Sequence, residues 1–160
     1  MNGWVGKLLR INLTTGEIKK EPLNTKDAND FVGARGLGTK IYCDEVNPKI
    51  DPLSPDNKII YITGPLTGTF ASSPGRYEVV TKAPLTGTIG AANSGGHWGP
   101  ELKYAGYDGL IVVGAAKKPV YIYINDDKVE IRKADHIWGK DVHESTDMLN
   151  GETSADARVA

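Results

Sequence analysis

The sequence predicts an α+β fold that is rich in strands and has only a few short helices. Seven short segments are apolar, alternating or β-branched enough to form strands, and turn-forming residues separate them. Only three segments have the spacing of helices, and each of them is short. With 160 residues, the chain is long enough for one ordinary domain with its own core.

The amino-terminal part predicts a hairpin and then a helix. The segments Lys7–Leu13 and Glu17–Glu21 have strand character, and the turn-forming residues 14–16 (TTG) join them. The segment Thr25–Val32 has a polar start and then apolar residues at helical spacing, and Gly33 stops it.

The next part predicts a second helix and two buried strands. The helix runs from about Leu37 to Val46, and the Asn-Pro pair that follows ends it. A proline-marked loop, Asp51–Asn57, leads to the strand Lys58–Thr63. The segment Tyr77–Lys82 repeats the character of that strand.

The carboxyl-terminal part predicts one more strand, a second hairpin and a last helix. The strand is Gly109–Gly114, and the hairpin joins Val120–Asn125 to Lys128–Lys133 through two aspartates. The helix is Asp141–Leu149. An apolar strand starts at Val159, so we interpret the carboxyl end as a cut within a longer domain.

Composition excludes several classes of function. The formal net charge of -1 gives no field that favours nucleic acid or a membrane surface. The sequence has neither the apolar core of a signal peptide nor a run long enough for a membrane helix, so we expect a cytoplasmic protein. The single cysteine, Cys43, excludes an internal disulfide and any Cys-x-x-Cys motif, and a buried inert thiol is the expectation for it.

Several conspicuous residues are interpreted as structural. The run GARGLG at Gly33–Gly38 lacks the spacing of a dinucleotide fingerprint, so helix termination and close packing are its expected roles. Trp98 and Trp138 are expected to be packing residues. The three histidines have no metal-ligand spacing, namely His97, His136 and His143.

A five-residue repeat marks the candidate functional region. The sequence PLTGT occurs at Pro65–Thr69 and again at Pro84–Thr88. Between Gly64 and Gly99 there are eight glycines but only three charged residues. Glycine lets backbone N–H groups converge on an anion, and the threonine hydroxyls add donors, which suits a phosphate or a polar heterocycle. The alternative is that PLTGT is a favourable turn after a strand, used twice.

One arginine stands alone between the two copies. Arg76 lies in SSPGRYEVV, and a guanidinium is suited to bidentate contacts with anions. The alternative is an ordinary surface or ion-paired arginine. The segment 92–96 (ANSGG) gives a second small-residue loop that could bring backbone amides and carbonyls to a ligand.

These residues carry a resemblance to a known family. One run closely resembles the amino-terminal domain of tungsten-containing aldehyde:ferredoxin oxidoreductases, namely NKIIYITGPLTGTFASSPGRYEVVTKAPLTGTIGAANSGGHWGPELKYAGYDGLIVVG. The segments GWVGKLLRINLTTGEI, VGARGLGTKIY, KPVYIYI and ADHIWGK resemble that family too. The resemblance covers essentially all of residues 1–160, which we expect to form one tungstopterin-binding domain.

The resemblance implies a pseudo-symmetric base of two β-sheets under a bis-pyranopterin cofactor of tungsten or molybdenum. A magnesium ion joins the pterin phosphates, and a 4Fe-4S cluster passes electrons to ferredoxin or to an iron–sulfur subunit. We hypothesise that the two PLTGT turns mirror the two similar halves of the cofactor. The cluster needs several thiolates, which Cys43 alone does not supply, so the resemblance also implies a longer protein.

The resemblance assigns cofactor-facing roles to a few positions. Arg76 matches an arginine between pterin and cluster, Asn93 matches a backbone carbonyl ligand of magnesium, and Gly95 matches a position against the pterin. The neighbours that we include with these positions are Ser94, Gly96 and Tyr77. No catalytic residue is assigned within this chain.

The implied reaction is the oxidation of a small aldehyde to a carboxylic acid with ferredoxin as electron acceptor. Two alternatives remain open. The first is a non-catalytic module that binds phosphate or pterin. The second is an enzyme of the same family with another substrate, such as an aromatic thioester reductase. The oligomeric state is also open, with a homodimer among the arrangements that fit.

Overall fold

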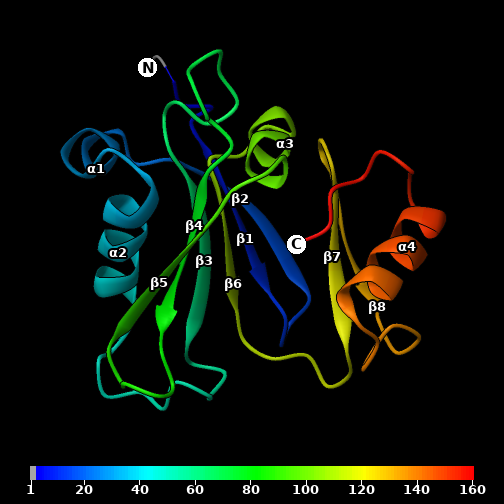
Figure 1. Cartoon of the computed structure of the whole chain (residues 1–160). Helices are drawn as coiled ribbons and strands as arrows, with labels where there is room; N and C mark the ends of the chain where they lie inside the picture. The colour runs from blue at the N-terminus through cyan, green and yellow to red at the C-terminus, as the bar shows by residue number, and fades with distance from the viewer. Residues whose placement is uncertain (1–2) are drawn as a thin grey trace.

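A six-stranded mixed sheet forms the centre of the molecule, and a separate two-stranded hairpin lies beside it (Figure 1). The structure is a computed structural model that describes residues 3–160. The main sheet has the strand order β2-β1-β6-β3-β4-β5, and the hairpin pairs β7 with β8. The strands are β1 (Lys7–Asn12), β2 (Glu17–Pro22), β3 (Lys58–Thr63), β4 (Tyr77–Lys82), β5 (Ile89–Ser94), β6 (Gly109–Val113), β7 (Val120–Asn125) and β8 (Lys128–Lys133). Two sheets with short helices confirm the predicted α+β class.

Seven of these strands coincide with the predicted segments, whereas β5 was not predicted. Its sequence, IGAANS, has only one large apolar side chain, and we interpreted its second half as a loop. The structure instead pairs β5 with β4 along its whole length, from Tyr77 opposite Ser94 to Lys82 opposite Ile89. Pairing with a neighbour, not local propensity, makes this segment a strand.

Four helices complete the fold, one more than the sequence predicted. They are α1 (Thr25–Phe31), α2 (Ala34–Glu45), α3 (Trp98–Tyr104) and α4 (Val142–Glu152). The unpredicted α3 begins Trp-Gly-Pro, which has the composition of a loop, although proline is tolerated in a first helical turn. Asn24 caps α1 and Asp141 caps α4 through side-chain oxygens, as expected for these residue types.

The glycines of the GARGLG run begin a helix and pack it closely. Gly33 is the N-cap of α2, so the helix starts three residues before the predicted Leu37. A Cβ atom on Gly38 would lie 2.8 Å from Ile62 Cγ2 and 2.9 Å from Val80 Cγ2. The expected close packing of this run is therefore confirmed, and its role at the helix boundary is initiation of α2 as well as termination of α1.

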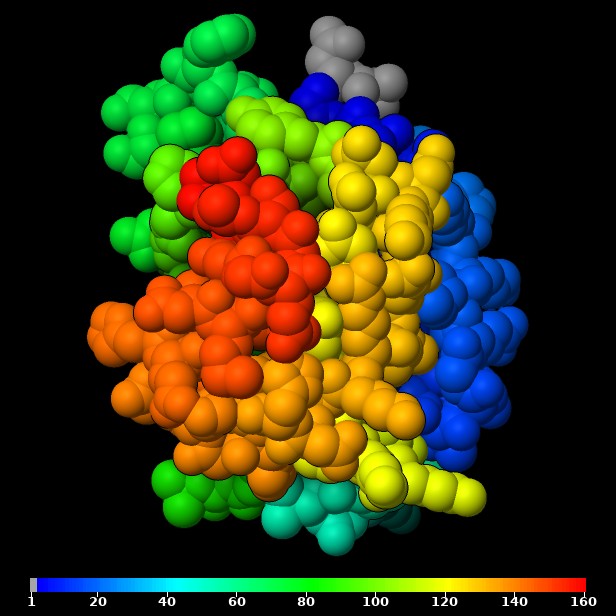
Figure 2. Space-filling model, turned by 90° about the vertical axis from the view of Figure 1, so that its right-hand side faces the viewer, coloured from blue at the N-terminus to red at the C-terminus, as the bar shows by residue number. Residues whose placement is uncertain are grey.

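Both faces of the main sheet are covered, one by two helices and the other by two helices and the hairpin (Figure 1). On one face, α1 and α2 pack on a core that includes Leu37, Ile60, Ile62, Val80 and Ile111. On the other face lie α3, the β7–β8 hairpin and α4, and the core there includes Leu9, Ile11, Leu102, Tyr107 and Leu110. The space-filling view of this second side shows α4 and the carboxyl-terminal residues lying over the hairpin (Figure 2).

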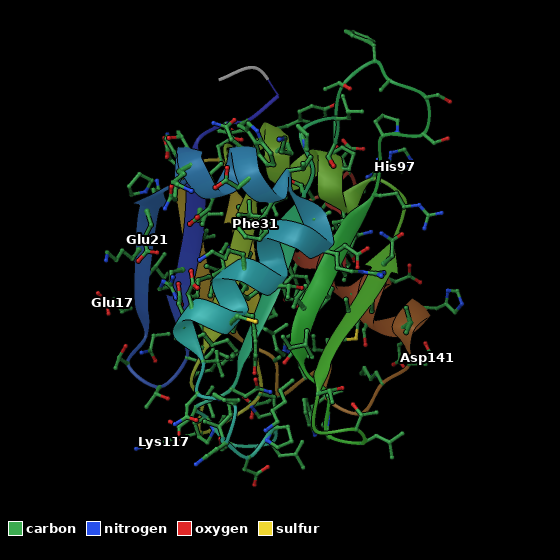
Figure 3. The ribbon with its side chains drawn as sticks, turned by 90° about the vertical axis from the view of Figure 1, so that its left-hand side faces the viewer. Glu17, Glu21, Phe31, His97, Lys117 and Asp141 are labelled. Carbon is green, nitrogen blue, oxygen red and sulfur yellow. The ribbon has the colours of Figure 1, made fainter. Side chains whose placement is uncertain are left out.

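The two edges of the main sheet differ in chemistry. The edge strand β2 has the sequence EIKKEP, and Figure 3 shows Glu17 and Glu21 along that edge. Charges and proline hinder pairing with another strand. The opposite edge strand, β5, has no charged residue, and nearly all of it is exposed. One edge is therefore protected and the other is open.

Two predictions about single residues are wrong. The Cys43 thiol belongs to an exposed residue, because its position on α2 faces away from the sheet. Trp138, expected to pack in the core, is 76% exposed. It lies in the turn between β8 and α4, which leaves its ring without a covering layer in this chain.

Candidate functional site

The structure brings Arg76 and Asn93 together at the upper end of β4 and β5, although they are 17 positions apart in the sequence. The Arg76 guanidinium donates from Nη1 to the side-chain oxygen Oδ1 of Asn93 at 2.5 Å. Antiparallel pairing sets Asn93 directly opposite Glu78, and residues two apart on a strand point to the same face. Arg76 and Glu78 therefore flank Asn93 on the α2 face of the sheet.

We call Arg76, Asn93, Glu78 and the glycines beside them the cluster, and Glu78 is its acidic member. Its residue is 6% exposed, and its Oε1 accepts a hydrogen bond from Asn93 Nδ2 at 3.0 Å. Arg35, in the first turn of α2, places Nη2 3.6 Å from the same oxygen. The second oxygen, Oε2, is buried and has no hydrogen-bond partner among the described residues. A buried carboxylate oxygen in that state is uncommon and points to a local role beyond folding.

Close backbone approach holds the glycines of the site beside Arg76. A Cβ atom on Gly75 would lie 2.3 Å from the carbonyl oxygen of Gly96, so only glycine fits there. Gly96 has a φ of +85°, which also favours glycine. A Cβ on Gly95 would lie 3.7 Å from Arg76 Nε and would cover one side of the guanidinium. Glycine thus leaves the arginine accessible.

The remaining predicted site residues face the other side of the sheet. The ring of Tyr77 is buried against Trp98, with 4.7 Å between ring centroids, and it also contacts Tyr61. Ser94 is opposite Tyr77 in the strand register and is exposed. Of the predicted set, the structure therefore brings Arg76, Asn93, Gly95 and Gly96 together, while Tyr77 packs in the core. The expectation that Trp98 is a packing residue is confirmed.

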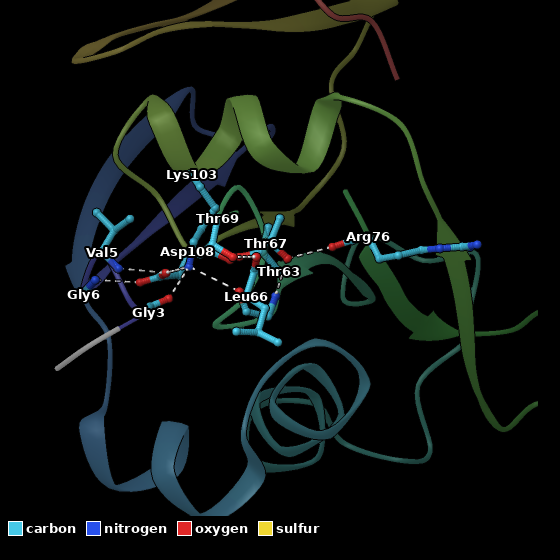
Figure 4. Close-up of polar contacts among 11 residues, drawn as sticks. Gly3, Val5, Gly6, Thr63, Leu66, Thr67, Thr69, Arg76, Lys103 and Asp108 are labelled. Carbon is cyan, nitrogen blue, oxygen red and sulfur yellow. Dashed lines mark hydrogen bonds and ion pairs between the residues drawn. The ribbon is translucent and has the colours of Figure 1, made fainter. Parts of the chain in front are cut away.

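The first PLTGT turn is bonded to the main chain of Arg76 (Figure 4). Thr67 Oγ1 donates to the main-chain carbonyl of Arg76 at 2.9 Å and accepts from the N–H of Gly64 at 3.1 Å. Thr69 Oγ1 donates within the turn, to the carbonyl of Leu66 at 2.8 Å. These hydroxyl protons make internal bonds, so they do not serve as the free ligand donors that we expected.

A buried ion pair fixes the base of the same turn (Figure 4). Asp108 is fully buried and accepts hydrogen bonds from the N–H groups of Val5 at 3.0 Å and Gly6 at 2.6 Å. Lys103 Nζ lies 2.9 Å from Asp108 Oδ1 and also donates to the carbonyl of Gly64 at 3.3 Å. The ammonium group therefore connects α3, the residue before β6 and the residue before the turn.

The second PLTGT turn lies at the other end of the sheet. The first copy follows β3 and the second follows β4, and these strands are antiparallel. Strands of this length separate the two turns by about 20 Å. In the second copy Thr86 is exposed, and its hydroxyl contacts only Thr88, at 2.9 Å. The two copies are therefore not neighbours, and each of them ends a strand, as the alternative of a turn used twice expects. That the two turns mirror the two halves of a cofactor stays a hypothesis.

A groove on the other face of the sheet is separate from this cluster. It has a volume of about 640 Å³ and lies between the α3 face of the main sheet, strand β7 and residues 153–160. Its lining is chiefly apolar and includes Tyr61, Leu110 and Val112. Burial raises the pKa of the Tyr61 hydroxyl, which therefore stays protonated at neutral pH.

Within residues 3–160, no group of three or more His, Cys, Asp or Glu side chains is arranged to hold a metal ion. In the same range, no helix is long and apolar enough to cross a membrane. The chemistry available at the cluster is therefore that of two exposed guanidinium groups, on Arg76 and Arg35, one amide, one buried carboxylate and glycine-rich backbone.

Sequence reasoning missed three contributors to the cluster. Glu78 looked ordinary, and Thr67 was expected only as a hydroxyl donor to a ligand, because the contacts that they make are with residues elsewhere in the sequence. Gly75 was visible as part of SPGRY, but the close approach to Gly96 required the strand register. The signal that could have suggested Glu78 is its place as an acid two residues before Val80, on the same face of the strand.

Comparison with known proteins gives a consistent picture. A family model described as "Aldehyde ferredoxin oxidoreductase, N-terminal domain" matches residues 8–160. A tungsten-containing aldehyde ferredoxin oxidoreductase of Pyrococcus horikoshii is 56% identical over 95% of this chain and 25% of its own length. The Pyrococcus furiosus protein of the same name is 52% identical over 98% of this chain and 26% of its own length.

Relatives with other names share the same domain. The WOR-like subunit of an aliphatic sulfonate oxidoreductase from Pyrococcus furiosus is 43% identical over 87% of this chain and 22% of its own length. The solved active site complex BamBC of benzoyl coenzyme A reductase, with 1,5-dienoyl-CoA, superposes with a TM-score of 0.92. It is 40% identical over 94% of this chain and 23% of that chain. This chain thus spans about a quarter of the length of the relatives that it matches.

Proposed function

This chain belongs to the aldehyde ferredoxin oxidoreductase family, and we propose that it is the cofactor-binding base domain of a tungsten bis-pterin enzyme that oxidises aldehydes. The family is one of tungsten-containing oxidoreductases, which implies a tungsten pterin cofactor. The observation that carries the proposal is the cluster of Arg76, Asn93, Gly95 and Gly96 at the open end of β4 and β5.

The residues of the cluster fit such a cofactor. The guanidinium of Arg76 is exposed and suits the phosphates of a pterin, and its glycine neighbours leave it uncovered. Magnesium prefers oxygen ligands, and the backbone carbonyl of Asn93 is one such ligand. These residues would hold and neutralise an anionic group.

The proposed net reaction converts an aldehyde and water into a carboxylic acid, two protons and two electrons. When bound, the tungsten pterin supplies the two-electron redox chemistry, and this domain supplies binding, orientation and charge compensation. The electrons would leave through a 4Fe-4S cluster to ferredoxin or to an iron–sulfur subunit. Cys43 is the single cysteine here, so the thiolates of that cluster would come from residues outside these 160.

A second candidate function keeps the cofactor but changes the substrate. The solved benzoyl coenzyme A reductase complex shares this fold at 40% identity, and the sulfonate oxidoreductase subunit is 43% identical. Similar base domains therefore occur in proteins named for different substrates. Aldehyde oxidation remains the preferred proposal because the relatives with that name are 52–56% identical.

The test uses the longer protein that carries this domain, purified without oxygen. The wild type is compared with Arg76→Ala, and Arg158→Ala is the matched control. We expect tungsten and iron in the wild type and in the control, aldehyde-dependent reduction of ferredoxin in both, and strong loss of tungsten or activity in Arg76→Ala. Wild-type protein without tungsten would overturn the proposal. Activity with an aromatic thioester but with no aldehyde would favour the second candidate.

A further inference from the structure

We propose that Glu78 is a positioning residue for Arg76 and that it acts through the side-chain amide of Asn93. The inference rests on the proposed function, because it concerns the guanidinium that would face the cofactor. It assigns a role to a residue that lies beneath the predicted site and does not itself reach the surface.

The amide of Asn93 has two different ends, and Glu78 determines which end faces Arg76. Asn93 Nδ2 donates to Glu78 Oε1 at 3.0 Å, and Oδ1 accepts from Arg76 Nη1 at 2.5 Å. An ionised carboxylate only accepts hydrogen bonds and a guanidinium only donates them. If the amide turned over, two donors would meet at Arg76 and two acceptors would meet at Glu78. Only one orientation of the amide satisfies both neighbours.

The strand register makes possible this chain of contacts from Glu78 through Asn93 to Arg76, which we call the relay. Glu78 is directly opposite Asn93 in the β4–β5 pair, and Arg76, the residue before β4, lies two positions before Glu78 and so on the same face. The Nδ2 group also lies 3.4 Å from the main-chain carbonyl of Tyr77, which gives it a second acceptor on the same side. The amide is therefore held by β4 at its nitrogen and presents its oxygen to the guanidinium.

The environment of Glu78 does not suit a residue that is retained for stability. It is 6% exposed, its Oε2 has no hydrogen-bond partner, and its nearest cation, Arg35, is 3.6 Å away and largely exposed. Burying a carboxylate with incomplete pairing destabilises a fold. A carboxylate at this position is explained by what it does for Asn93 and Arg76.

The relay makes a specific prediction about the motion of Arg76. With the amide fixed, the Nη1 group is bonded and rotation of the guanidinium about Nε–Cζ is slowed. Replacing Glu78 with leucine removes the acceptor, frees the amide and lets the guanidinium rotate. Replacing it with glutamine keeps a carbonyl oxygen that accepts from Asn93 Nδ2, so the relay is retained.

The experiment measures guanidinium rotation by ¹⁵N exchange NMR on the chain of residues 1–160, which has only five arginines to resolve. We expect Glu78→Leu to accelerate rotation at Arg76 about tenfold, the effect of losing a hydrogen bond of about 1.4 kcal/mol. Glu78→Gln should restore slow rotation, and the matched control Glu101→Gln, on exposed surface, should leave it unchanged. Unchanged rotation in Glu78→Leu, or no rescue by glutamine, would overturn the proposal.

A second substitution tests the relay at Asn93, its middle member, which is exposed and not buried. Asn93→Leu replaces an exposed strand residue and should free Arg76 as much as Glu78→Leu does. In the Asn93→Leu background, replacing Glu78 should have no additional effect on Arg76, because its path of action is gone. An additional effect would show that Glu78 acts on Arg76 by another route.

The tungsten content of the longer protein links the relay to function. We expect Glu78→Leu to lower the tungsten content and Glu78→Gln to retain it. Wild-type protein without tungsten would refute the proposed function while leaving the NMR result on Arg76 intact. Full tungsten content in Glu78→Leu, with Arg76 freed, would show that an ordered Arg76 is not needed to hold the cofactor.

Discussion

Removal of the Asp108 carboxylate should be among the most destabilising substitutions in this chain. Asp108 is fully buried and bonded to two backbone N–H groups and to Lys103 Nζ. In Asp108→Ala the Lys103 ammonium would remain 9% exposed, with only main-chain carbonyls and the ring of Trp4, 5.2 Å from Nζ, as partners. The substitution leaves a cation buried without its counter-charge.

The magnitude follows from breaking one side of a buried pair. Such substitutions cost about 3–5 kcal/mol, because the remaining charge is neither hydrated nor paired. Domains of this size are stable by about 5–15 kcal/mol, so the variant keeps only part of its stability. Replacing both partners, as Lys103→Met with Asp108→Ala, should cost about 2 kcal/mol less than the two single substitutions together, since neither charge is then left alone.

Equilibrium unfolding in urea, followed by circular dichroism, measures these differences in the unfolding free energy. The control is Asp135→Ala, which replaces an exposed aspartate and should change stability by less than about 0.5 kcal/mol. A cost below about 1 kcal/mol for Asp108→Ala would mean that the pair behaves as an exposed one. That result would refute the buried ion pair as the anchor of the first PLTGT turn.

Three further predictions follow from contacts described above. Thr67→Val should cost about 1–2 kcal/mol of unfolding free energy because it leaves the partly buried N–H of Gly64 and carbonyl of Arg76 without their hydroxyl partner. The same change at the exposed Thr86 should cost less than about 0.5 kcal/mol, and equal costs would contradict the different roles of the two turns. Gly38→Ala should lower the melting temperature, with a cost of about 1–3 kcal/mol from overpacking, while Gly151→Ala, where a Cβ meets open space on a helix, should raise it. Burial alone would raise the pKa of Glu45, but hydrogen bonds from its arginine and lysine partners outweigh burial and hold that pKa below its usual range. The contribution of Glu45 to stability is therefore present above about pH 4.3 and is lost as the pH falls further, so in Glu45→Gln the acid-induced loss of unfolding free energy should be smaller by about 1 kcal/mol or less.

Local patterns in the sequence were sufficient to predict most of the regular structure. The strands of alternating or β-branched residues and the helices with polar caps were found because their signals lie within a few positions. Strand β5 and helix α3 were missed for one reason. Small residues, glycine and proline have loop composition, and in these segments pairing and packing with distant residues override that composition.

The candidate site was predictable only in part. Arg76 and the glycine-rich segments stood out by composition, and the family resemblance assigned Asn93. The contact of Asn93 with Glu78 depends on a strand register that no local pattern specifies. The distance between the two PLTGT turns depends on the same kind of information. The turns follow antiparallel strands and therefore lie at opposite ends of the sheet, which the repeat itself does not reveal. Identical sequences therefore acquired different roles from their surroundings.

The uncharged edge strand β5 has a practical consequence for handling this chain. A flat strand with free N–H and C=O groups and no charged side chain is a template on which another strand can add. The chain produced by itself should therefore self-associate as its concentration rises, through β5 and not through the charged β2. A lysine in place of the exposed Ala91 should keep it monomeric. In the longer protein, the same lysine would hinder any segment that packs against β5. A single substitution would therefore report both on the self-association of this chain and on the assembly of the longer protein.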